Sequence, residues 1–223
     1  DPRGTVTEYE YDDTTGTMSQ AIQDPSGLNL ITNYISDGMG RIIETRGPAH
    51  EVSGQTVRTV EWTVYLDADH EVRRASGYLI GTNSYTLVNP VSITRTDASG
   101  RIVDEINAVR GSGVESSGAL TAGDSFPQSS WKSWTHHEYD DGRLQSTQVY
   151  HTIPTSGSGS SGTNYDQTAF GYDVMGRQNY AKSAAGTISR TVYDARGLAL
   201  SNWVGTNDTG ATDASPAGSG RQK

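Results

Sequence analysis

A short motif recurs along the whole chain and constrains its fold more than any other feature. It comprises an aromatic or small polar residue, an aspartate, one to three further residues, a glycine and often an arginine. Six copies contain the motif residues Tyr11, Asp12, Gly16, Asp37, Gly40, Arg41, Asp97, Gly100, Arg101, Tyr139, Asp140, Gly142, Arg143, Tyr172, Asp173, Gly176, Arg177, Tyr193, Asp194 and Gly197. A degenerate copy at Asp67 has His70 in place of glycine. Because the aspartates lie 21 to 43 residues apart, the pattern indicates one structural unit joined by loops of different length.

The residue types of the motif are those that tight turns need. An aspartate side chain can accept a hydrogen bond from a backbone N–H two residues further on. Glycine adopts the positive φ of hairpin turns without steric cost. A second turn motif, Asp24-Pro25-Ser26-Gly27 and its copy at residues 1–4, alternates with the first. Each unit therefore predicts a strand, a turn, a second strand and a second turn.

The segments between the turns alternate in polarity with period two. In residues 5–11, 28–34 and 187–193, threonine and tyrosine fall mostly on one face, a pattern typical of half-buried strands. We therefore predict an all-β fold of tandem antiparallel hairpins that form a spiralling sheet strip or part of a β shell, with almost no helix. Residues 1–204 would form the array of about seven units, and residues 205–223 a Gly/Ser/Asp-rich linker or tail.

Three insertions, at residues 47–54, 111–131 and 155–162, follow Gly-Arg strands and should emerge from the same end of the hairpins. Neither end of the array has a recognisable capping unit. Repeat arrays bury their inner units only against neighbours, and open sheet edges recruit further strands. We therefore expect neighbouring repeats of a longer parent chain, a partner chain or another copy of this chain to cover at least one terminal edge.

Composition excludes several classes of protein. Only 33% of the residues are hydrophobic, which is too few for a thick aliphatic core but suits thin β layers. The formal charge of −9 disfavours nucleic acid as a partner. Without cysteine there are no disulfides and no thiolate metal sites. No apolar run approaches the roughly 20 residues that span a bilayer.

Two clusters resemble metal sites but fit them poorly. His136, His137 and Glu138 precede Asp140, yet neighbouring residues of a strand point to opposite faces. Asp67, Asp69 and Glu71 have the first spacings of a calcium loop, but valine stands where that loop needs glycine, and no glutamate follows at its twelfth position. We therefore assign no metal, no cofactor and no catalytic residue.

The aromatic and basic residues leave two interpretations open. Trp62, Trp131, Trp134 and Trp203 could stack on sugars or fill the core at sheet edges, and we favour the core. The motif arginines could form ion pairs with nearby aspartates or a row of ligand-binding groups, and we favour the ion pairs.

The tandem Tyr-Asp-x-x-Gly-Arg units, such as 172–177, interleaved with Asp-Pro-x-Gly turns, resemble the YD or RHS repeats over residues 1 to about 203. These repeats occur in bacterial RHS proteins, in the C component of Tc toxins and in teneurins. The resemblance implies a strip of stacked hairpins that spirals into a hollow shell, in large proteins that are usually exported or attached to the cell surface. Complete shells contain many more repeats, and the closing segment with its aspartyl self-cleavage site has no counterpart here.

From the motifs and the resemblance together we expect a non-catalytic structural module of a large exported bacterial protein. It would help to build a β shell or stalk that scaffolds, encloses or displays other domains, outside the cell or at its surface. One alternative is a module that binds carbohydrate or a cell surface through loops such as 111–131. Another is a subunit of an extracellular polymer that is joined through open sheet edges.

Overall fold

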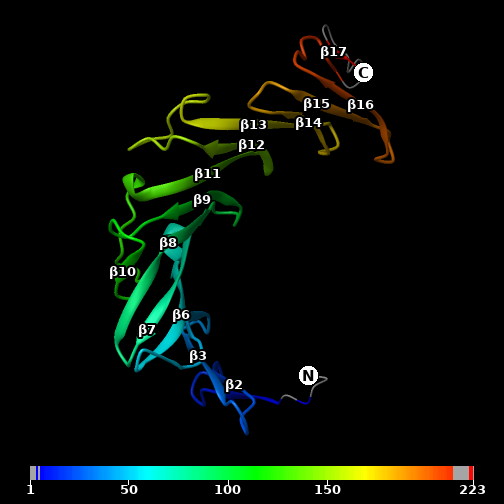
Figure 1. Ribbon diagram of the computed structural model, residues 1–223. Helices are drawn as coiled ribbons and strands as arrows, with labels where there is room; N and C mark the ends of the chain where they lie inside the picture. Colours follow the sequence, from blue (N-terminus) through cyan, green and yellow to red (C-terminus); the bar gives the residue numbers. More distant parts are fainter. Residues whose placement is uncertain (1–3, 5, 213–220, 223) are drawn as a thin grey trace. The chain divides into compact units, whose positions relative to one another are not determined.

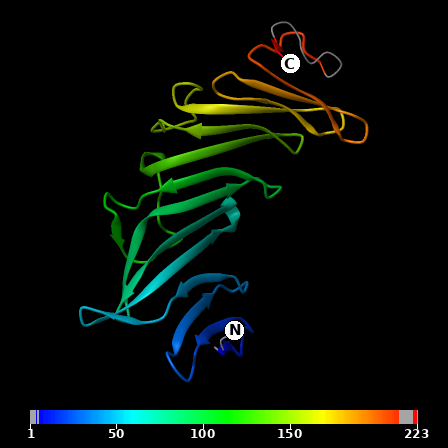
Figure 2. The same cartoon turned by 45° about the vertical axis from the view of Figure 1, so that its right-hand side comes forward.

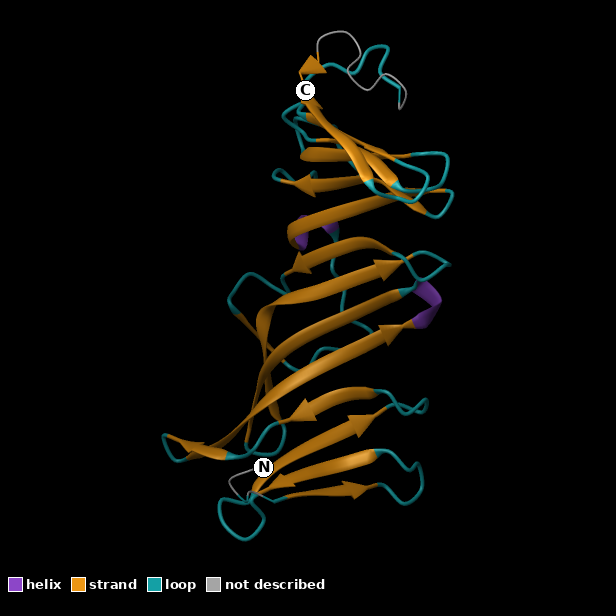
Figure 3. Ribbon diagram, turned by 90° about the vertical axis from the view of Figure 1, so that its right-hand side faces the viewer, coloured by secondary structure: helices purple, strands orange, loops and turns teal. Residues whose placement is uncertain are grey.

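A computed structural model describes residue 4, residues 6–212 and residues 221–222. Within these residues the chain is all-β, with antiparallel hairpins throughout, so the predicted fold class is confirmed. The helical content of this part consists of two short 3-10 turns, visible in Figure 3 as the small purple segments. The predicted turn at residues 1–4 and most of the predicted tail beyond residue 212 lie outside the described residues.

The chain divides into two compact units, Asp1–Lys132 and Ser133–Lys223, which are described separately. The elements of the N-terminal unit are β1 (Thr7–Tyr11), β2 (Met18–Gln23), β3 (Leu30–Ser36), β4 (Ile42–Arg46), β5 (His50–Val52), β6 (Gln55–Leu66), η1 (Asp67–Asp69), β7 (Glu71–Ile80), β8 (Ser84–Thr96), β9 (Ile102–Ala108), β10 (Glu115–Ser117) and η2 (Gln128–Ser130). Those of the C-terminal unit are β11 (Trp131–Asp140, which begins just before the boundary), β12 (Arg143–Tyr150), β13 (Tyr165–Tyr172), β14 (Gln178–Lys182), β15 (Ile188–Tyr193), β16 (Ala199–Gly205) and β17 (Arg221–Gln222).

Within each unit the sheet follows the order of the sequence. In the N-terminal unit β1 to β4 pair in succession, β4 pairs with β6, and β6 to β9, which are labelled in Figure 1, continue the series. The short β5 pairs with the start of β6, and β10 folds back onto β8. In the C-terminal unit β11 to β17 pair in succession, and Figure 2 shows β12 to β16 side by side in yellow to orange.

Every hairpin that carries the six-copy motif contains a β-bulge at the same place. The register shifts at the residue before the motif aspartate, so that one residue of the returning strand has no opposite partner. These unopposed residues are Ser19, Ile43, Val103, Gln145, Asn179 and Leu200. A bulge bends its strand and increases the local twist. The motif therefore specifies a curved and twisted hairpin rather than a turn alone.

The largest core lies on one face of β6 to β9. Strand pairing places the apolar side chains of β6 to β9 opposite one another, and segment 109–130 contributes two more buried side chains, Leu120 and Phe126. This core consists of Val60, Trp62, Ala75, Leu79, Leu87, Val91, Ile93, Ile106, Ala108, Leu120 and Phe126. The C-terminal unit buries less, chiefly Trp134, Tyr150 and Ile188. The few hydrophobic side chains of the sequence thus form one thin core layer in each unit.

The expectation of half-buried strands is wrong at β1 but holds at β3 and β15. All residues of β1 are exposed, including Tyr9 at 58%, because β1 lies at the edge of its sheet and no segment among the described residues covers either face. In β15 the buried residue is Ile188, which lies on the face opposite Ser189, because burial of an apolar side chain is favoured over burial of a polar one. Alternation marked both segments as strands, but it did not identify the buried face.

Candidate functional site

The motif aspartate organises its own turn. For Asp37, carboxylate oxygen Oδ1 accepts hydrogen bonds from the backbone N–H groups of Met39 and Arg41, both at 2.9 Å. The same pair of bonds, to residues two and four positions on, occurs at Asp97, Asp173 and Asp194. The glycines of these turns have φ between 79° and 87°. The carboxylate thus serves as an acceptor that fixes the backbone.

In three turns the arginine after the glycine binds the other carboxylate oxygen. The Nε–Oδ2 distances are 2.8 Å for Arg41 and Asp37, 2.7 Å for the pair at 101 and 97, and 2.6 Å for the pair at 177 and 173. The side chain and backbone N–H of Arg101 lower the pKa of Asp97, and the backbone N–H of Arg41 lowers that of Asp37. These aspartates remain ionised and bound, which does not suit a proton-transfer role.

Other copies of the motif form different turns. The loop after Asp12 is one residue longer, and the Asp12 carboxylate accepts from the backbone of the next two threonines. Between β11 and β12 the turn contains only Asp141 and Gly142, both with positive φ (46° and 80°), and Asp140 pairs with Arg143 across it. This is the type I′ geometry, in which the motif aspartate is a strand residue and not the acceptor of the turn.

The motif arginine also reaches the next hairpin. The guanidinium of Arg143 lies over the ring of Tyr172, with 5.6 Å from Cζ to the centroid, and that of Arg177 lies over Tyr193 at 4.9 Å. In return each tyrosine hydroxyl donates to the backbone carbonyl of the residue after the arginine: Tyr172 to Leu144 at 2.9 Å, and Tyr193 to Gln178 at 3.2 Å. We call this two-part interaction the Arg–Tyr contact.

In the N-terminal unit, Arg41 makes a related contact with the degenerate motif copy. Its guanidinium lies 4.0 Å from the centroid of Tyr65 and donates to both carboxylate oxygens of Asp67, at 2.7 and 2.9 Å. The carboxylates of Asp67 and Asp37 together raise the pKa of Arg41. The arginine therefore joins its own turn to the turn of the next hairpin. Tyr65 stands one residue earlier than the motif tyrosine, so the repeat pattern does not include it.

In the contact between the next two hairpins the charges are reversed: the residue after the turn is acidic, and its partner on the following hairpin is an arginine. Glu71 occupies the position after the turn residue His70, where other copies have arginine, and His70 takes the left-handed conformation in place of glycine. The Glu71 carboxylate is buried and binds Arg95 Nε at 2.7 Å and also Arg73. Arg95 stands in the position that Tyr65 holds one hairpin earlier. In the sequence, this contact is indicated by an acidic residue, Glu71, at a position where other copies of the motif have arginine.

Segment 109–130 is folded onto the core face rather than extended into solvent. The Arg110 guanidinium donates to three successive carbonyls, those of 117–119, at 2.6 to 2.9 Å, and to the Asp124 carboxylate at 3.2 Å. From the sheet, Arg73 donates to the Asp124 carbonyl and lies over the buried Phe126 ring at 5.2 Å. Two arginines outside the repeat motif therefore anchor this insertion.

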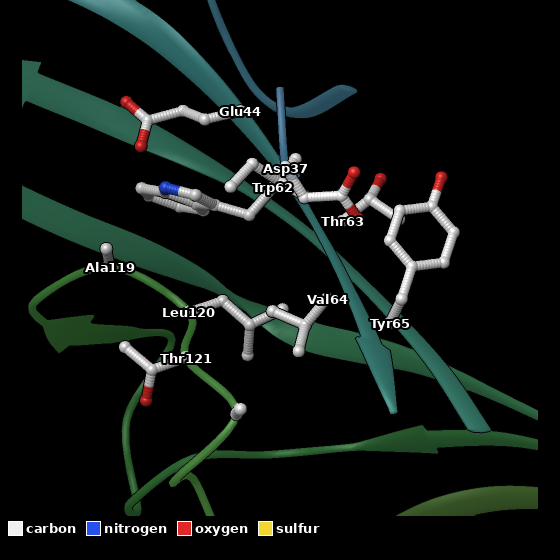
Figure 4. A pocket seen from close by; sticks show the side chains of 11 residues that line it. Asp37, Glu44, Trp62, Thr63, Val64, Tyr65, Ala119, Leu120 and Thr121 are labelled. Carbon is white, nitrogen blue, oxygen red and sulfur yellow. The ribbon is translucent and has the colours of Figure 1, made fainter. Parts of the chain in front are cut away.

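A pocket of about 310 Å³ lies where this segment meets the sheet. Figure 4 shows its lining, which comes from Asp37, from residues 43–44 of β4, from Trp62–Tyr65 of β6 and from residues 119–122. Both carboxylates in the pocket have partners. Asp37 binds Arg41, and Glu44 binds Arg46 and the hydroxyl of Tyr85. The indole Nε1 of Trp62 is fully buried and has no partner among the described residues. It therefore offers no accessible donor to a molecule in the pocket.

Several of the candidate metal ligands have protein partners. Glu138 accepts hydrogen bonds from Ser146 and Gln148, and His137 Nδ1 lies 3.1 Å from the Thr147 hydroxyl. In the second cluster Asp67 binds Arg41, and Glu71 is buried between two arginines. Among the residues that the structure describes, no three His, Asp or Glu side chains are grouped to hold an ion.

The tryptophans lie in or beside the cores. Trp62 and Trp134 are 3% and 7% exposed, and Trp134 stacks on Tyr150 with centroids 3.8 Å apart. Trp131 and Trp203 are half-buried, and the indole of Trp131 donates to the Phe126 carbonyl at 3.0 Å. The two buried rings have no open face on which a sugar could stack.

No helix of the described residues has the length and apolar character to cross a membrane.

Comparison with known proteins found only weak similarity. The crystal structure of TcdB2-TccC3-TEV matches at 11% sequence identity and a TM-score of 0.24, over 90% of this chain and 13% of that one. A structure of the Photorhabdus luminescens Tc holotoxin pore, mutated in TccC3, matches at 11% identity and a TM-score of 0.25, over 92% and 12%. The chain spans about an eighth of these two chains. At these values the likeness carries no argument about function.

No protein-family model matches the sequence, and no curated protein matches it.

Proposed function

We propose that this chain is a non-catalytic structural repeat module of a large exported bacterial protein. In this role it extends a sheet strip, part of a β shell or stalk outside the cell or at its surface, that scaffolds, encloses or displays other domains. The observation that carries the proposal is the Arg–Tyr contact. Repeat residues such as Arg143, Tyr172 and Arg177 are used to join successive hairpins, which is what a continuous strip requires.

The other features of the chain fit the same role. The aspartates act as turn acceptors, and strands of the sheet contribute most of the lining of the pocket beside Trp62. Stability that comes from contacts between neighbouring hairpins is typical of repeat scaffolds. We also propose residues 1–204 as the repeat array and residues 205–223 as its linker or tail.

Mechanical unfolding of the chain tests the scaffold role. A strip of hairpins held by nearest-neighbour contacts should unfold under force in several small steps, each releasing one or two hairpins. A glycan array serves as the parallel measurement. Selective binding of a glycan, lost when the surface of segment 111–131 is substituted, would replace the scaffold proposal with the binding module. A single cooperative step would contradict nearest-neighbour stability.

A further inference from the structure

In the first repeat motif, Tyr11 stands at the position of the tyrosine in the Arg–Tyr contact, but it has no arginine partner among the described residues. Tyr11 pairs across a bulge in the same way as Tyr172 and Tyr193, so the three residues are structurally equivalent. The two later tyrosines are half-buried, each beneath an arginine of the preceding hairpin. Tyr11 is 60% exposed, and no arginine lies over it among the described residues.

The strand that carries Tyr11 is also open along its edge. Within the described part of the chain β1 pairs with β2 alone, and every residue of β1 is exposed. Tyr9 and Tyr11 lie on one face of the strand and Glu8 and Glu10 on the other. Asp12 follows directly, and its carboxylate is held in the turn. The edge therefore combines unpaired backbone groups, exposed aromatic rings and negative charge.

We propose that the free edge of β1 binds a β-hairpin that carries an arginine directly after its turn glycine. The returning strand of that hairpin pairs with β1, its guanidinium lies over Tyr11 beside the Asp12 turn, and the Tyr11 hydroxyl donates to the carbonyl of the residue after the arginine. This geometry is that of Arg177 on Tyr193. The inference rests on the proposed function and specifies the partner that the function requires.

A second copy of this chain does not meet the requirement. Its last repeat motif, at Asp194, has Leu198 in the position after the turn glycine, and that side chain is 58% exposed. The arginine of this copy, Arg196, lies before the glycine, where its side chain bonds weakly to Asp194 at 3.3 Å. A copy docked by this hairpin onto β1 would leave Tyr11 uncovered. The chemistry therefore favours a different, arginine-bearing hairpin.

The hairpin of residues 169–182 provides the probe, because it contains Gly176 and Arg177 and its ends, Ala169 and Lys182, lie opposite each other. A synthetic peptide of this sequence, closed by a disulfide between cysteines added at its ends, is titrated into the full chain. Hydrogen exchange of the amides of residues 7–11 should slow on binding. The matched control peptide carries Arg177→Gln and should bind about three- to tenfold more weakly, as expected for loss of a cation–π contact.

Variants of the chain make the test independent of the folding of the peptide. Tyr11→Ala should weaken binding of the unchanged peptide by the same factor, and combining it with the Arg177→Gln peptide should add little further loss. Because Tyr11 is exposed, the variant should keep the melting temperature of the parent. Light scattering should give the mass of a monomer, 23.9 kDa, at all concentrations.

Three results would overturn the inference. Equal binding of both peptides would leave edge pairing, and with it the scaffold role, intact but remove the arginine requirement. Concentration-dependent association that protects residues 7–11 would identify a second copy as the occupant. No protection of these amides at saturating peptide would show that the edge does not accept a hairpin, and it would count against the scaffold role as well.

Discussion

At the scale of single residues, the positive φ of the turn glycine restricts which residues can replace it. Gly176 has φ of 80°, and a Cβ built there would lie 2.8 Å from the Arg143 guanidinium, which occupies the adjacent space. Gly176→Val should therefore destabilise the protein by about 1–2 kcal/mol through backbone strain alone. Gly142→Val, also at φ of 80°, should cost a similar amount.

Urea unfolding measures both effects. Gly38→Ala is the matched control, since Gly38 lies in an equivalent turn without a positive φ and no atom lies within 4 Å of a Cβ built there. Wild-type stability for Gly176→Val would contradict the assigned turn geometry.

The tyrosine of the motif contributes through its hydroxyl as well as its ring. Tyr172→Phe keeps the ring under Arg143 but removes the hydrogen bond to the Leu144 carbonyl. We expect a loss of about 0.5–1.5 kcal/mol in the free energy of unfolding. Tyr11→Phe is the control and should be neutral, because Tyr11 is exposed. Equal effects at the two positions would show that the hydrogen bond between hairpins contributes nothing.

At the scale of elements, the buried charges of β7 hold segment 109–130 against the sheet. Burial raises the pKa of Glu71, but the hydrogen bonds and charges of Arg95 and Arg73 outweigh it, so that the pKa lies below its ordinary value of 4.5. A carboxylate with a lowered pKa in the folded state stabilises the protein fully above pH 4.5, and this stabilisation is lost as the pH falls through the folded-state pKa.

Glu71→Gln tests this assignment. It should cost about 3 kcal/mol at pH 7, because two arginines keep their charge beside a neutral amide. The difference from wild type should shrink as the pH falls through the lowered folded-state pKa of Glu71, because the wild-type carboxylate then becomes protonated as well. Glu61→Gln, on an exposed position of β6, is the control. A pH-independent difference would contradict the role of the Glu71 charge.

The sequence predicted the elements of this fold better than their packing. Aspartate and glycine at fixed spacing predict a turn because they act within four residues, and Asp173 and Gly176 illustrate this. The contact of Arg41 with Tyr65 depends on which hairpins become neighbours and on a shift of one position, neither of which local spacing encodes. The anchoring of segment 109–130 by Arg110 likewise depends on the folded arrangement of the segment, whereas the sequence indicates only an insertion or a binding loop at residues 111–131.

At the scale of the whole molecule, the buried apolar residues that the structure describes are divided between the two compact units. Two compact units each have a thin core of their own, built around residues such as Leu87 in one and Ile188 in the other. Most stabilisation therefore comes from adjacent hairpins, as in other repeat arrays. In such a molecule a local change should affect its immediate neighbours and fade within a few strands.

Ile188→Ala tests this locality. Ile188 is 1% exposed and lies opposite Lys182 of β14 and Gly205 of β16. Removing its side chain should destabilise the surrounding hairpins by about 2–5 kcal/mol. Hydrogen exchange should accelerate in β14, β15 and β16 and remain at the wild-type rate in β6, β7 and β8. Val204→Ala, which truncates a side chain that is 56% exposed, is the control. If exchange accelerated equally in both units, the chain would be a single cooperative domain, because only a shared folding transition transmits a local loss to every strand.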